Sequence, residues 1–184
     1  MATLAPAARN NEAHWRWRVT LGLGLVLAAL HGLVLPRLCA PEYRPDLFTL
    51  FAVYLSLFSA RQGRYWHLLA LGLLRDLFSL GLLGSYGVLY SLLYKGIGRA
   101  RGKLDPERPG NTLLFGFAGV FAVNVGYHVT LVASGDGVGW SAAFTRCLIT
   151  AAVTAPWALP TFVLAHYALE KLKCPRAPGG CWAI

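Results

Sequence analysis

The chain has 184 residues, of which 56% are hydrophobic and 14% are charged, and its mean hydropathy is +0.50. This composition excludes a water-soluble domain with a polar surface, so we expect an integral membrane protein. The formal charge of +9 comes from 17 Lys and Arg against 8 Asp and Glu, and in a membrane protein it is expected to record orientation rather than nucleic-acid binding. The four cysteines fall at different expected depths, which argues against a disulfide framework.

The N-terminal part of the chain predicts a tail and two helices. Residues 1–18 are polar and rich in Arg and Trp, a pattern typical of a cytoplasmic tail that ends in an interfacial anchor. The apolar run at 19–35 is expected to be a retained helix, because no convincing cleavage site follows it. Pro45 and Asp46 then open a second helix that runs to about residue 60. The Asp46 carboxylate is expected to cap the free N–H groups of that helix.

The third apolar run, residues 65–83, carries two adjacent charges, Arg75 and Asp76. A charge in hydrocarbon costs several kcal/mol unless it finds a partner, water or the interface. Adjacent residues of a helix point about 100° apart, so these two must each turn to another helix. Since Asp46 begins its helix at the same expected depth, we predict one polar cluster of Asp46, Arg75 and Asp76. Two interpretations are weighed: the cluster is closed within the bundle, or part of it is offered to a partner helix. We expect the second, in which Arg75 and Asp76 matter more to assembly than to the fold of the isolated chain, so that Asp76→Asn weakens partner capture.

Two more features mark the fourth and fifth helices. The fourth is expected at 85–98, and a basic cytoplasmic connection follows it to residue 111. The fifth, at 112–134, carries the small residues Gly116, Gly119 and Ala122, which are expected to lie against another helix. Later in the same helix, Asn124 and His128 lie four residues apart on one face, and we expect them to hydrogen-bond to a neighbouring helix.

The last expected helix runs from 141 to 172, with a kink caused by Pro156 and Pro160. Residues 173–184 form a second cytoplasmic tail. With the N-terminus inside, 13 basic residues fall on inner segments and 3 on outer ones, which predicts that both termini are cytoplasmic. The predicted fold class is therefore an all-α integral membrane protein with six transmembrane helices, which occupy residues 19–172.

A short motif gives this chain a family resemblance. Pro45-Asp46-Leu47 leads into a helix with Tyr54, and Gly72-Leu73-Leu74-Arg75-Asp76-Leu77 follows with Ser79 and Gly84. In a six-helix chain of this length the motif resembles MreD, the rod shape-determining membrane protein family of bacteria. The resemblance is most specific over residues 45–95. Within this stretch, Asp46, Arg75 and Asp76 are expected to form a partner-binding or bundle cluster, and Gly72 and Gly84 are expected to serve helix packing.

The resemblance implies a non-enzymatic scaffold in the bacterial cytoplasmic membrane. Its expected partner is an MreC-like protein, and through it the MreB filament, RodA and a penicillin-binding transpeptidase of lateral peptidoglycan synthesis. No cofactor, metal or nucleic acid is expected. The family is also thought to share its six-helix arrangement with the substrate-binding subunits of energy-coupling-factor transporters. A vitamin-type small-molecule binding subunit is therefore the alternative, although the short external loops offer little to close over a ligand.

An enzyme would need a nucleophile with a base, or clustered carboxylates that hold a metal. In the outer half of the predicted bundle, Asp46, Asp76, His128 and Arg146 are the candidates. No known spacing links these four residues, so we expect no enzymatic activity.

Overall fold

The computed structural model describes residues 20–38, 40, 43–58, 65–79, 83–100, 108–135 and 139–171, and these residues form helices and turns without a strand. The predicted all-helical class is thereby confirmed. The two predicted tails, 1–18 and 173–184, lie outside the described residues. Most of the basic connections between helices lie outside them as well.

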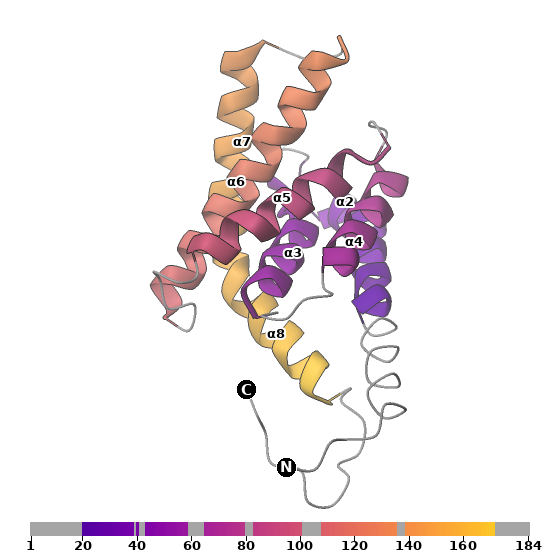
Figure 1. The fold of residues 1–184 in the computed structure, drawn as a ribbon, viewed down its shortest axis with the longest axis vertical. Coiled ribbons are helices and arrows are strands. Elements are labelled where there is room, and N and C mark those ends of the chain that lie inside the picture. Colours follow the sequence, from indigo (N-terminus) through magenta and orange to yellow (C-terminus); the bar gives the residue numbers. More distant parts are fainter. Residues whose placement is uncertain are drawn as a thin grey trace, which may run out of the picture.

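The helices follow the apolar runs of the sequence. A helix at Thr20–Ala29 continues through the π-helical turn η1 (Leu30–Val34) into α2 (Leu35–Leu38). Three helices of moderate length come next: α3 (Leu47–Phe58), α4 (Tyr65–Phe78) and α5 (Ser85–Ala100). The C-terminal half consists of α6 (Pro109–Ala133), α7 (Trp140–Thr154), the 3₁₀ turn η3 (Ala155–Trp157) and α8 (Ala158–Lys171). In Figure 1, α6 and α7 lie side by side at one end of the molecule and α8 continues toward the other.

Proline explains where the last helices begin and bend. Pro109 occupies the start of α6, where its missing N–H costs nothing, and so α6 begins three residues before the predicted position. Pro156 lies in η3, between α7 and α8, as the predicted kink requires. Pro160 does not add a second break, because it falls in the first turn of α8, whose N–H groups have no partner within the helix anyway.

Helix α3 is the centre of the bundle. Every residue from Phe48 to Leu57 is buried, and the helix contacts α4, α5, α6 and α8. In Figure 1, α5 crosses obliquely next to it. A helix that is apolar on all sides is stable where other helices enclose it. The 12-residue α3 therefore holds its neighbours in place through its whole circumference.

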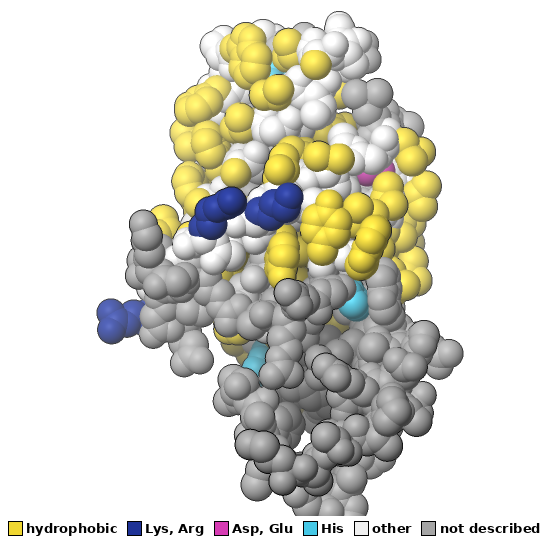
Figure 2. Space-filling model, in the orientation of Figure 1, with side chains coloured by type: hydrophobic (Ala, Val, Ile, Leu, Met, Phe, Trp, Pro, Cys, Tyr) yellow, Lys and Arg dark blue, Asp and Glu magenta, His cyan; other side chains and the backbone are white. Residues whose placement is uncertain are grey.

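Among the described residues, two helical segments are long and apolar enough to cross a membrane. They are Pro109–Ala133 and the continuous run Trp140–Ala168, with mean hydropathies of 1.5 and 1.7. Only 33% and 28% of their most apolar stretches are buried within the chain, so these segments differ from the enclosed α3. Figure 2 shows apolar side chains spread over the described part of the face in view. This outward apolar surface is compatible with a membrane location.

Candidate functional site

An ion pair between Asp46 and Arg75 joins the start of α3 to α4. Nη1 of Arg75 donates a hydrogen bond to Oδ1 of Asp46 at 2.8 Å. The side chains are 4% and 12% exposed, so solvent reaches neither charge freely. A buried ion pair is stable only when further hydrogen bonds satisfy its remaining polar atoms. The neighbouring hydroxyl groups supply these bonds.

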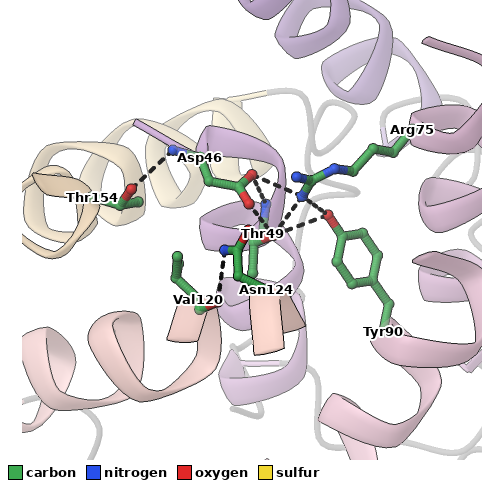
Figure 3. Close-up of polar contacts among 7 residues, drawn as sticks. All are labelled: Asp46, Thr49, Arg75, Tyr90, Val120, Asn124 and Thr154. Atoms are coloured by element: carbon green, nitrogen blue, oxygen red, sulfur yellow. Dashed lines mark hydrogen bonds and ion pairs between the residues drawn. The ribbon is translucent and has the colours of Figure 1, made fainter. Parts of the chain in front are cut away.

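Thr49 and Tyr90 complete the hydrogen bonds of the pair. The Thr49 backbone N–H donates to Oδ1 of Asp46 at 3.1 Å, and Thr49 Oγ1 donates to Oδ2 at 2.7 Å. Nη1 of Arg75 also lies 2.6 Å from Thr49 Oγ1 and 2.7 Å from the Tyr90 hydroxyl. Figure 3 shows Arg75 and Tyr90 pointing toward Thr49 from α4 and α5. The network thus binds three helices together and confirms the predicted capping role of Asp46.

Two further contacts extend this network to the other half of the chain. The guanidinium carbon of Arg75 lies 3.8 Å from the ring centroid of Tyr86, and Tyr86 stacks on Tyr127 of α6 at 4.6 Å. On the opposite side, the Asp46 backbone N–H donates to Oγ1 of Thr154 at 3.0 Å. Thr154 is the last residue of α7 and is fully buried. The ion pair therefore contacts α5 and α7 directly, and it reaches α6 through the ring of Tyr86.

Asp76 lies apart from the pair and binds the start of α5. Its Oδ2 accepts the Gly84 N–H at 3.0 Å, and its Oδ1 accepts the Ser85 hydroxyl at 3.1 Å and the Tyr86 N–H at 3.2 Å. A carboxylate in this place satisfies free N–H groups and meets the positive end of the helix dipole. The predicted cluster of three is thus divided: Asp46 and Arg75 come together, whereas the 100° rotation to the next residue directs Asp76 toward α5.

The two glycines of the motif have different roles. A Cβ atom on Gly72 would lie 2.5 Å from the backbone Cα and N of Gly87, so α4 and α5 approach each other here at the distance that only glycine allows. A Cβ atom on Gly84, by contrast, would meet no atom within 4 Å, and the backbone φ of Gly84 is +97°. The prediction that Gly84 packs between helices is wrong, because this glycine permits the tight turn before α5.

The small residues of α6 also divide into two groups. A Cβ atom on Gly116 would lie 2.8 Å from Cβ of Ala158, and one on Gly119 would lie 2.5 Å from Cγ2 of Val53. The prediction that both glycines lie against another helix is confirmed: Gly116 packs against α8 and Gly119 against α3. Ala122 is exposed, so the prediction that it packs against another helix is wrong. The buried stripe continues through Val123 instead.

Asn124 and His128 do not make the predicted hydrogen bonds to another helix. The Asn124 side chain donates to the Val120 carbonyl of its own helix at 2.8 Å. His128 is buried, and its ring stands edge-on to Trp140 at 5.2 Å between centroids. Among the described residues, Nε2 of His128 has no hydrogen-bond partner. His128 therefore contacts α7 through ring packing.

The sequence did not single out the four residues that complete the network: Thr49, Tyr86, Tyr90 and Thr154. A signal for Thr49 exists, because a hydroxyl three residues after a capping Asp is placed to bond it. Tyr86 and Tyr90 are four residues apart and hence on one face of α5. Thr154 is 108 residues from Asp46, and no local pattern links the two.

The site is thus a satisfied charge network inside an all-helical protein. Among the residues that the structure describes, no three His, Cys, Asp or Glu side chains are grouped so that they could hold a metal ion. The chain matches no protein-family model, no curated protein and no solved structure. The arrangement of its own residues is therefore the basis for the function proposed below.

Proposed function

We propose that this chain is a non-enzymatic membrane scaffold of the bacterial cell-elongation machinery, similar to MreD. One observation carries the proposal: the residues of the motif at 45–95 form one contact unit. Asp46, Arg75, Asp76 and Gly72 each make a contact between helices, and together these contacts fix α3, α4 and α5. A scaffold needs such a rigid core, since its partners recognise the position of its helices.

The proposed arrangement has six transmembrane segments in the bacterial inner membrane, with both termini cytoplasmic. The apolar runs and the basic residues of the inner segments support it. Helix α3, at 12 residues, rises only about 18 Å, against the roughly 30 Å of a bilayer core. A helix this short can still lie within the membrane here, because neighbouring helices rather than lipid surround it.

An MreC-like membrane protein is the proposed direct partner. The MreB filament, RodA and a penicillin-binding transpeptidase would be reached through that partner. The outer faces of α4 and α5 are apolar and exposed at Leu73, Leu77, Val88 and Leu92. Such faces are suited to contact with lipid or with a partner's helix, whereas the charged groups of the site are closed within the chain.

Labelling with a membrane-impermeant maleimide tests the proposed orientation. Single cysteines are placed at Gly110 and at Gly135, both of which are exposed, in a variant whose native cysteines are replaced. We expect labelling of the Gly135→Cys variant in intact cells and of the Gly110→Cys variant only after lysis. The reverse pattern would overturn the orientation.

Affinity purification tests the function. The tagged full chain is purified from membranes of its own bacterium, with an unrelated six-helix membrane protein as the control bait. We expect an MreC-like protein to be enriched by mass spectrometry, and we expect depletion of the chain to produce rounded cells. Enrichment of transporter ATPases with normal cell shape would contradict the scaffold proposal.

A cavity of about 650 Å³, open to the surface beside α7, is the observation behind a second candidate function, that of a small-molecule binding subunit. This candidate function predicts that transporter ATPases are enriched in the affinity purification just described. It also predicts tight binding of a water-soluble vitamin by the isolated chain.

A further inference from the structure

The cavity lies between Tyr43 and the first eleven residues of α7. Its wall on α7 is formed by Ser141, Thr145, Arg146, Ile149 and Thr150, with Ala142 between them. These positions share one side of the helix, while the buried stripe of α7 occupies another. The cavity is therefore open on the side of α7 that does not pack into the bundle.

Arg146 gives this cavity a positive charge, for which the described part of the chain supplies no counter-charge. Its side chain is exposed, and among the described residues no carboxylate or hydrogen-bond acceptor engages it. Arg146 is the seventh residue of the apolar segment Trp140–Ala168, so it lies about 9 Å along the axis from the start of that segment. A guanidinium at this depth requires an anion or access to the interface.

The cavity is lined by hydroxyl-bearing residues as well as by the cation, and apolar surface lies beside it. Tyr43, Ser141 and Thr150, whose side chains carry hydroxyl groups, line the same cavity as Arg146. Ile149 supplies an apolar wall, and Phe144 and Leu148 on the neighbouring strip of α7 are exposed. One cation, several hydroxyl donors and an apolar strip match an amphiphile with a phosphate head and hydrocarbon chains.

We propose that this cavity binds the phosphate headgroup of an anionic membrane phospholipid. Arg146 donates to the phosphate oxygens, the hydroxyls of Tyr43, Ser141 and Thr150 donate further hydrogen bonds, and the acyl chains lie along the exposed apolar strip of α7. The inference rests on the membrane orientation of the proposed function, which places Tyr43 and the start of α7 at the outer face. It does not depend on the MreC-like partner.

Native mass spectrometry of the purified, delipidated full chain in detergent tests the proposal. The probes are phosphatidylglycerol, diacylglycerol with the same acyl chains, sn-glycerol 3-phosphate and riboflavin. We expect phosphatidylglycerol to bind and the other three to bind at least tenfold more weakly. Arg146→Gln should weaken phosphatidylglycerol binding about tenfold, the effect of losing a hydrogen bond to a charged group.

Two further variants keep the test specific. Ile149→Trp fills the cavity while leaving the charge, and it should weaken binding about as much as Arg146→Gln. Arg37→Gln removes an exposed charge from the same expected side of the membrane but away from the cavity, and it should change binding less than twofold.

Four outcomes would overturn the proposal: equal binding of diacylglycerol, equal effects of Arg37→Gln and Arg146→Gln, complete displacement by glycerol phosphate, or preferential binding of riboflavin. These four outcomes concern only the lipid site and do not bear on the capture of an MreC-like protein. The proposed membrane orientation is tested separately, by the cysteine labelling described above.

Discussion

Asp46 and Asp76, two buried carboxylates among the described residues, are stabilised in different ways. Each residue is 3% exposed. Asp46 meets the guanidinium of Arg75 on another helix, together with the backbone N–H and the hydroxyl of Thr49 on its own helix. Asp76 meets two backbone N–H groups and a hydroxyl at the start of α5, eight to ten residues further along the chain.

The difference shows what each site depends on. The Asp46 site depends on a second buried charge, so loss of either partner leaves the other uncompensated in the bundle. The Asp76 site depends on backbone groups that no substitution removes, and a neutral oxygen can still accept from them. Substitutions should therefore be costly at the first site and mild at the second.

The largest effect is expected for Arg75→Met, which removes the cation and leaves Asp46 buried. We expect a loss of about 3 kcal/mol in the free energy of unfolding. Reversible unfolding in mixed detergent micelles measures it. The double variant Asp46→Asn/Arg75→Met removes both charges and should recover at least half of the loss. If the double variant loses as much free energy of unfolding as the two single variants lose together, the charges do not act as a pair.

An intermediate effect is expected for Gly72→Ala. Gly72 lets α4 and α5 approach closely, and the hydrogen bonds of Asp76 to the start of α5 depend on that approach. The new methyl group would meet the Gly87 backbone, which cannot yield as a flexible side chain does. We expect a loss of about 2 kcal/mol, measured as above.

Gly96→Ala is the matched control, because a methyl group at that position of α5 meets nothing within 4 Å. It should be neutral or slightly stabilising, since Ala favours helix over Gly. If both variants lose the same free energy of unfolding, the close approach of α4 and α5 is not the cause of the loss in Gly72→Ala.

The smallest effect is expected for Asp76→Asn, which removes the charge and keeps one acceptor oxygen at the start of α5. A loss of about 1 kcal/mol is expected, against about 3 kcal/mol for the same substitution at Asp46. Capture of the MreC-like partner should stay near normal, because the hydrogen bonds of this carboxylate lie within the chain, whereas the sequence predicted weakened capture. Normal stability together with lost capture would instead assign the Asp76 carboxylate to a partner.

The sequence predicts the helices well and their contacts partially. The apolar runs and the break at Pro45 place most helix ends within a few residues, because these signals are local. The start of α6 at Pro109 and the turn at Gly84 were not predicted. The pairing of Asp46 with Arg75 follows from the cost of leaving either charge alone. The role of Asp76 does not follow, since it depends on where α5 begins relative to α4. The contact of Thr154 with Asp46 depends on the packing of the whole bundle.

The central position of α3 has a consequence for the order in which the chain is made. Asp46 precedes Arg75 by 29 residues, so it leaves the ribosome about 1.5 to 6 seconds earlier at ordinary rates of synthesis. During that interval its carboxylate lacks the guanidinium, and α5, α6 and α8 do not yet enclose the helix. In the proposed membrane setting, α3 and α4 would therefore enter the bilayer together as a hairpin, and the time of insertion would be set by the synthesis of Arg75.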